Sequence, residues 1–130
     1  MKNNKDKMKL AAAMILLVAA ASSCTHEPFV AVEPTVSFRT DIIPVFTTRC
    51  ALNSACHSGA ANAGNNIDLD SAAAYASIQS KHLVITDHPT ASLLYVEVSS
   101  GTMPKAPASA LTAVQTKLIL NWIDQGAKNN

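Results

Sequence analysis

The N-terminal end of the chain most strongly limits what the rest can fold into. Residues 1–9 carry four lysines, and residues 10–23 are apolar or small and carry no charge. A basic segment followed by a short apolar one is typical of a secretory signal. Because small residues directly precede Cys24, we predict a lipoprotein signal peptide over residues 1–23 and lipidation of Cys24. An ordinary secretory signal and an uncleaved anchor helix are the alternatives, and all three export the chain.

Removal of the signal leaves enough chain for one domain with one core. Residues 24–36 contain Pro28 and Pro34 and show no periodic pattern, so we expect a lipidated N-terminus and a tether there. The domain is then expected over residues 37–130. This organisation predicts a membrane-anchored lipoprotein that faces the periplasm or the cell surface.

Charge and composition argue against two classes of function. The whole chain has a formal net charge of +1, but four of its lysines lie in the signal, so the predicted mature part is slightly acidic. It lacks a basic patch interleaved with aromatic residues, so nucleic-acid binding has no support. Ser58 follows His57 without an oriented carboxylate, and hydrolase chemistry is unsupported as well. We expect a protein that is not an enzyme.

Several segments have the spacing of short helices. Ser37 is a candidate N-cap for a first helix that ends near Cys50, and Ser71 is one for a second helix over residues 72–79. A third helix is expected over about residues 91–98. Between these segments the chain is rich in Gly, Asn, Ala, Ser and Pro, which predicts long loops.

The last helix has the clearest signal. Thr112 followed by Gln115 is the pattern of a capping box, and Gly126 is placed to end the helix. One face of this helix is predicted to be apolar, with Val114, Leu118, Ile119, Trp122 and Ile123. We therefore predict an all-α fold of three to four short helices with long loops and no convincing strand. The loops are long for so small a domain, and a largely apolar cofactor between the helices would complete the core.

Cys50, Cys56 and His57 indicate which cofactor this is. In c-type cytochromes two cysteine thiols bond to the haem vinyl groups, and the histidine after the second cysteine binds the iron. The order of these residues predicts haem c attached through Cys50 and Cys56, with the iron held by His57. The predicted fold thus surrounds one haem.

The spacing between the cysteines is longer than the usual two residues, because Ala51–Ala55 lie between them. The additional residues can loop outward around Asn53 and Ser54 while both sulfur atoms stay near the vinyl groups. A haem with one thioether, or a Cys50–Cys56 disulfide beside haem held by His57, is the intermediate possibility.

Met103 is the candidate for the second axial ligand. The other three methionines fall in the signal, and Met103 lies beside Pro104 in a loop before the last helix. A thioether in that position can bind iron, and His/Met ligation raises the reduction potential. Either His82 or His88 could replace Met103 and give bis-histidine ligation.

These features together resemble the class I cytochrome c family, especially the small cytochrome c-like domains of exported bacterial lipoproteins. The resemblance covers about residues 38–128 and includes IIPVFTTRC, ACHSG, NNIDLDSAAAYASI, SLLYVEVSSGTMPK and LILNWIDQGA. It implies a cytochrome c-like fold, with His57 as the proximal ligand and Met103 as the distal ligand. It also implies that Trp122 packs near the first helix.

The predicted function is therefore single-haem electron transfer at a bacterial membrane, with redox proteins as partners. The protein would act as a monomer or as a component of a larger redox complex. One alternative is a haem-free lipoprotein module that is stapled by a Cys50–Cys56 disulfide and binds a partner or a glycan. Another is a zinc site made of Cys50, Cys56, His57 and His82 or His88.

Overall fold

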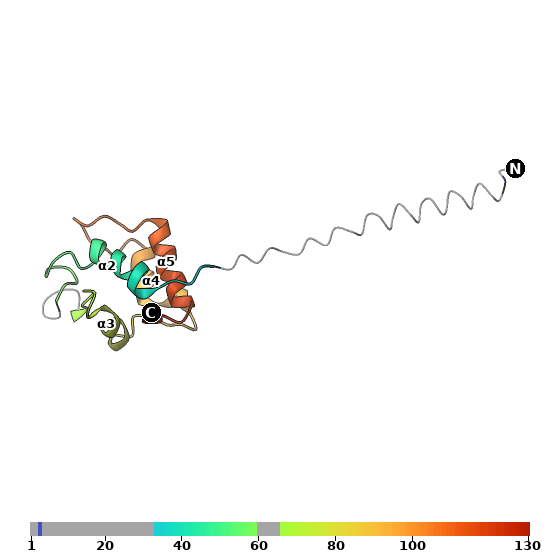
Figure 1. Cartoon of the computed structure of the whole chain (residues 1–130). Helices are drawn as coiled ribbons and strands as arrows, with labels where there is room; N and C mark the ends of the chain where they lie inside the picture. The colour runs from blue at the N-terminus through green and yellow to red at the C-terminus, as the bar shows by residue number, and fades with distance from the viewer. Residues whose placement is uncertain (1–2, 4–32, 60–65) are drawn as a thin grey trace. The chain divides into compact units, whose positions relative to one another are not determined.

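The computed structural model describes residues 3, 33–59 and 66–130. Cys24 and nearly all of the predicted signal peptide lie outside these residues. The chain divides into two units, and the compact unit that contains the helices is Pro34–Asn130 (Figure 1). None of the helices in the described part of the chain is both long and apolar enough to cross a membrane.

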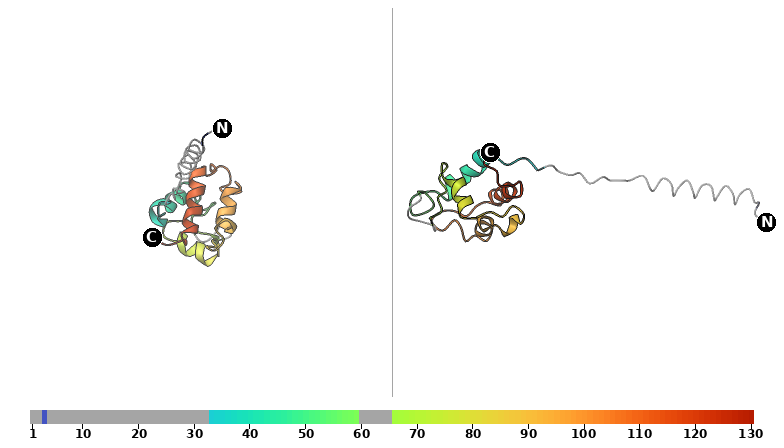
Figure 2. Two further views of the ribbon diagram at one scale, coloured as in Figure 1. Left: turned by 90° about the vertical axis from the view of Figure 1, so that its right-hand side faces the viewer. Right: turned by 90° about the horizontal axis from the view of Figure 1, so that it is seen from below.

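The described residues are helical and contain no strand, so the all-α prediction is confirmed. The α-helices are α2 (Ile43–Arg49), α3 (Ala74–Ser80), α4 (Leu93–Ser99) and α5 (Ala113–Asp124). A π-helical turn, η1 (Phe38–Ile42), precedes α2, and a 3-10 turn, η3 (Pro89–Ala91), precedes α4. Helices α4 and α5 pack side by side (Figure 2).

The first helical segment begins at the predicted cap. The Ser37 hydroxyl accepts a hydrogen bond from the Thr40 backbone N–H, and the Ser37 N–H donates to Asp41. Pro44 lacks the N–H that would bond to the Thr40 carbonyl in an α-helix. Directly before Pro44 the chain forms the wider η1 turn, in which the Ile43 N–H donates to the Phe38 carbonyl.

The prediction that Ser71 caps the second helix is wrong. Helix α3 begins at Ala74, and no side chain caps it. Instead, the Asp70 carbonyl accepts hydrogen bonds from the N–H groups of Ala73 and Ala74, at 2.9 and 2.8 Å. Ser71 therefore lies in a turn before the helix and is exposed.

Helix α5 has both predicted ends. Thr112 and Gln115 form a capping box, and Gly126 adopts a positive φ of 95° just after the helix. The N–H groups of Gly126 and Ala127 return to the carbonyls of Ile123 and Trp122, which is a Schellman motif. Val114 departs from the prediction, because it is 76% exposed in the first turn.

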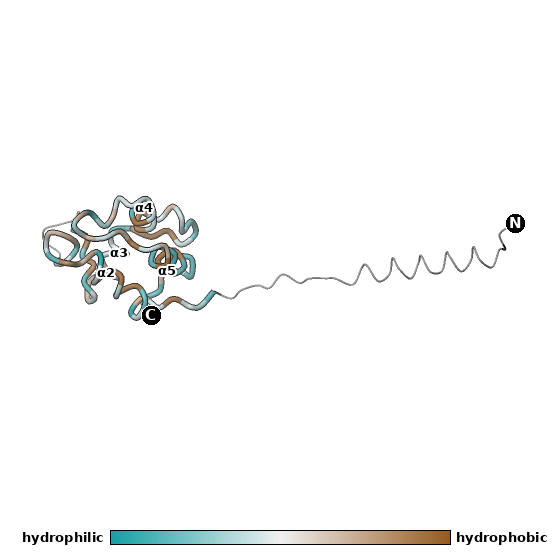
Figure 3. The backbone as a smooth tube through the Cα atoms, turned by 90° about the horizontal axis from the view of Figure 1, so that it is seen from above, coloured by the Kyte–Doolittle hydropathy of each residue, from teal (hydrophilic) through white to brown (hydrophobic). Residues whose placement is uncertain are grey.

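Phe38 is at the centre of the hydrophobic core. Its ring centroid lies 6.2 Å from that of Phe46 in α2, 5.4 Å from that of Tyr75 in α3 and 5.0 Å from that of Trp122 in α5. The predicted packing of Trp122 near the first helical segment is therefore confirmed. Burial of one such aromatic side chain contributes about 1.5–3 kcal/mol. The hydrophobic stretches of α4 and α5 are brown in Figure 3.

The compact unit begins at Pro34 rather than at Ser37. Val36 is buried, and its N–H donates to the Gln125 side chain at 2.8 Å. The Gln125 amide in turn donates to the Pro34 carbonyl at 3.1 Å. These bonds to Gln125, the residue that directly follows α5, explain why the last residues of the predicted tether pack with the domain.

Candidate cofactor site

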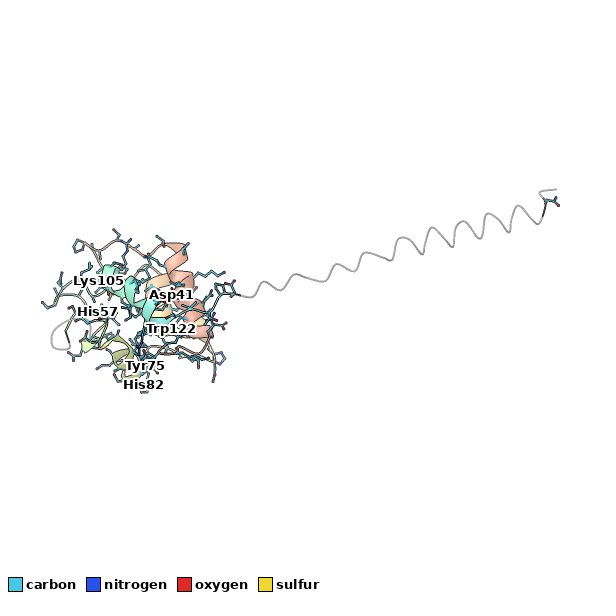
Figure 4. The ribbon with its side chains drawn as sticks, viewed as in Figure 1. Asp41, His57, Tyr75, His82, Lys105 and Trp122 are labelled. Atoms are coloured by element: carbon cyan, nitrogen blue, oxygen red, sulfur yellow. The ribbon has the colours of Figure 1, made fainter. Side chains whose placement is uncertain are left out.

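A cavity of about 450 Å³ lies beside the C-terminal end of α2. Cys50, Cys56, His57 and Met103 all line it, so one site contains the four residues predicted to hold haem. Figure 4 shows His57 and Lys105, another lining residue, on the same side of the domain. The apolar part of the wall includes three loop residues and two helix residues, namely Ile67, Leu69, Leu83, Leu94 and Val98.

The chain between the two cysteines folds into a compact turn. The His57 N–H donates to the Cys50 carbonyl at 3.1 Å, which closes the turn. Asn53 organises its interior: the side-chain oxygen accepts from Ala55 N–H, and the carbonyl accepts from Cys56 N–H. This closure keeps Cys50 and His57 close in spite of the long spacing.

Most of the intervening residues are exposed, as expected from the sequence, although Ala51 is half-buried and Ala55 also lines the cavity. Leu52 is 46% exposed, and Asn53, Ser54 and Ala55 are exposed as well. Cys50 is buried and Cys56 is half-buried, and both are free thiols that face the cavity. The longer spacing is therefore accommodated by an outward loop and not by withdrawal of a cysteine.

A hydrogen bond orients the His57 ring. Its Nδ1 lies 3.1 Å from the Ile67 carbonyl oxygen. Because a carbonyl only accepts, this bond requires a proton on Nδ1 and leaves the lone pair on Nε2 free. Metal-binding histidines usually have such a second bond, which fixes the ring and its tautomer.

Hydrogen bonds to Leu69 and Asp70 also hold the segment that contains His57. The Leu69 N–H donates to the His57 carbonyl at 2.7 Å. The Asp70 carboxylate accepts from the Ser58 hydroxyl and the Gly59 N–H, both at 3.1 Å. Asp70 thus joins the residues directly after His57 to the turn before α3. The sequence did not reveal this structural role.

Met103 reaches the cavity from a distant part of the chain. It is half-buried, and its N–H donates to the Glu97 carbonyl at the end of α4, at 2.9 Å. Gly101 adopts a positive φ of 76°, which lets the chain turn back after α4. The loop therefore holds the Met103 thioether in the wall that it shares with His57.

The alternative ligands lie elsewhere. His82 and His88 are exposed and do not line the cavity. Within residues 33–59 and 66–130, no group of three or more His, Cys, Asp and Glu side chains is placed to hold a metal ion. The zinc site predicted as an alternative is therefore not assembled in the described part of the chain.

Burial changes the chemistry of Cys50. Desolvation, with a smaller effect from the neighbouring Cys56 thiolate, raises the pKa of Cys50 from 9.0 to about 11. The thiol therefore stays protonated at neutral pH in the haem-free protein.

Three charged residues also line the cavity and were not predicted as site residues. These are Arg49, Glu97 and Lys105. The sequence signal for two of them is adjacency, since Arg49 directly precedes Cys50 and Lys105 follows Met103-Pro104. Helical spacing alone could not show that Glu97 faces the cavity from α4.

Comparisons of the chain with protein-family models, with curated proteins and with solved structures found no match.

Proposed function

We propose that the compact unit is a cytochrome c-like electron-transfer domain that binds one haem c. In this proposal Cys50 and Cys56 form thioether bonds to the haem, and His57 and Met103 bind its iron. The observation that carries the proposal is that one cavity is lined by all four residues, although Met103 comes from a distant loop. A packing role alone does not explain why the domain brings two thiols, an imidazole and a thioether together.

The cavity fits such a group in size and chemistry. Its volume of about 450 Å³ lies within the range of about 300–1,000 Å³ that is usual for cofactor sites. Its wall is largely apolar, and its donor atoms are those that attach haem c and bind its iron. The free Nε2 of His57 is available to bind the iron, because Nδ1 is engaged with Ile67.

The proposed activity is one-electron transfer without conversion of a substrate. A bound haem supplies iron that cycles between the ferrous and ferric states. His57 and Met103 would both hold the iron, so no ligand position would be left for oxygen or peroxide. The apolar wall excludes water, and His/Met ligation favours the ferrous state.

The proposed setting of the domain is a bacterial membrane. Lipidation of Cys24 would anchor it to a membrane, with the domain in the periplasm or at the cell surface, where redox proteins are its partners. The basic N-terminal residues and the apolar segment before Cys24 support this part. The packing of Phe38 on Trp122 supports a cytochrome c-like arrangement of the first and last helices.

The test is expression with export in a host that has haem-attachment machinery. Denatured and washed protein should retain haem absorption, and mass spectrometry should find one haem and the acyl chains on separate residues. The variants Cys50→Ala and Cys56→Ala should each lose one thioether. Met103→Ala should lose the sulfur-to-iron absorption band, whereas the matched control His82→Ala should keep it.

A folded, colourless protein with a Cys50–Cys56 disulfide would contradict the proposal and support the haem-free module. Retention of the sulfur-to-iron band in Met103→Ala would contradict the assignment of the distal ligand. A change of iron ligation in the absorption spectrum of His57→Ala but not of His88→Ala is expected for the proximal ligand.

A further inference from the structure

Arg49 is a cavity residue that the proposed function does not use. It is the last residue of α2, directly before Cys50, and it lines the cavity together with His57 and Met103. Its Nε atom is buried and has no hydrogen-bond partner. Burial of part of a cation without a partner costs free energy. Arg49 as a whole is half-buried, so its positive charge lies partly within the cavity wall.

The positive charge of Arg49 is not neutralised by the domain around it. Among the described residues Arg49 has no ion pair, and residues 60–65 contain no acidic side chain. The other cavity residues that are charged at neutral pH are Glu97 and Lys105, whose charges are opposite. The cavity wall therefore keeps an excess positive charge at Arg49.

We infer that Arg49 raises the reduction potential of haem bound in this cavity, because the wall that contains His57 and Met103 then carries a positive charge that no described side chain of the protein pairs with. This inference rests on the proposed function. Ferric iron carries one more positive charge than ferrous iron, so a fixed cation nearby disfavours the ferric state. The effect increases when a bound group displaces water, because the interaction then acts through a medium of lower dielectric constant. Arg49 would not bind the iron and would act on it only through its positive charge.

The experiment compares reduction potentials of the haem-loaded full chain by spectroelectrochemical titration. Arg49→Met keeps the side-chain stem but removes the charge, and Arg49→Lys keeps the charge. Arg39→Met is the matched control, because Arg39 is exposed on η1 and does not line the cavity. Arg49→Met should lower the ferrous-to-ferric ratio at a fixed potential about tenfold, which corresponds to about 59 mV for one electron. Arg49→Lys should keep most of the wild-type value, and Arg39→Met should change it little because exposed charges are screened.

Equal potentials for Arg49→Met and Arg39→Met would overturn the inference. An equal loss in Arg49→Lys and Arg49→Met would also overturn it, because hydrogen bonding rather than charge would then be responsible. If Arg49→Met does not fold, Arg49→His allows the charge to be switched within one protein. Its potential should fall as pH rises through the histidine pKa, by more than in the wild type, which contains the same Glu97 and Lys105.

Failure of this inference is distinguishable from failure of the proposed function. A wild-type protein without covalently retained haem contradicts the proposed function. A haem-loaded wild type whose potential does not respond to the charge at position 49 contradicts the role of Arg49 alone.

Discussion

The two cysteines of the cavity differ in how far they are buried. Cys50 is 8% exposed, whereas Cys56 is half-buried. Thioether formation uses the sulfur of each residue, but the haem-free protein presents them differently to solvent. The difference can be measured before any haem is attached, because the thiolate is the reactive form of cysteine.

In haem-free protein, alkylation of Cys50 should be slow at pH 8 and should accelerate as pH approaches 11. The reason is that burial raises the pKa of Cys50 to about 11. Mass spectrometry after timed treatment with iodoacetamide measures the rate at each cysteine. Alkylation of Cys50 at pH 8 as fast as in urea-unfolded protein would contradict the prediction.

The same pKa shift predicts a loss of stability at high pH. The thiol form stabilises the fold fully below pH 9.0, and this contribution is lost as pH rises to about 11. The loss in the free energy of unfolding is about 2–3 kcal/mol, from about 1.4 kcal/mol per pKa unit. Denaturant titrations of haem-free protein at several pH values measure it, and Cys50→Ala, which lacks the thiol, should not show the loss.

Among the helices, the start of α5 depends on two side chains. The Gln115 N–H donates to the Thr112 hydroxyl at 3.2 Å, and the Gln115 side chain accepts from the Thr112 N–H at 3.0 Å. Thr112→Ala should destabilise the domain by about 1 kcal/mol. Thermal unfolding monitored by circular dichroism should show a decrease in Tm of about 4–8 °C. The exposed Ser109→Ala is the control, and an equal Tm for both variants would contradict the role of the cap.

Capping residues also show how much of the fold was predictable. Ser37, Thr112 and Gly126 act through neighbours within a few residues, so their roles could be predicted from the sequence. Ser71 has the same residue type as Ser37, but Asp70 takes its place before α3 through its carbonyl. Backbone acceptors have no signature in sequence, and that prediction therefore failed.

The side chains proposed to hold the haem could be predicted from the sequence, but the contacts around them could not. Cys50, Cys56, His57 and Met103 could be selected because their residue types and order are chemically unusual. The contact of His57 with the Ile67 carbonyl and the unpaired Nε of Arg49 depend on tertiary packing, and no local pattern indicates them.

On the scale of the whole domain, Asn130 joins the end of the chain to its first helical turn. Its side chain accepts from the Phe38 N–H at 2.9 Å and donates to the Val36 carbonyl at 3.3 Å. Its carbonyl oxygen accepts from the Arg39 N–H and from the Ser37 hydroxyl, both at 3.0 Å. The free N–H groups at the start of η1 are thereby satisfied.

Asn130→Ala should destabilise the domain by about 1–3 kcal/mol, because the Phe38 N–H loses its partner. Chemical denaturation of the variant measures the free energy of unfolding. The neighbouring Asn129→Ala is the matched control, since Asn129 is exposed. A loss of stability in Asn129→Ala as large as in Asn130→Ala would show that these hydrogen bonds are not responsible.

Hydrogen bonds between Asn130 and the four residues Val36, Ser37, Phe38 and Arg39 bring the two ends of the compact unit together. Domains with adjacent ends tolerate insertion into loops of other proteins, because the host chain leaves and returns at nearly the same point. This domain could therefore be inserted into a loop of another protein, with both junctions beside the first helical turn.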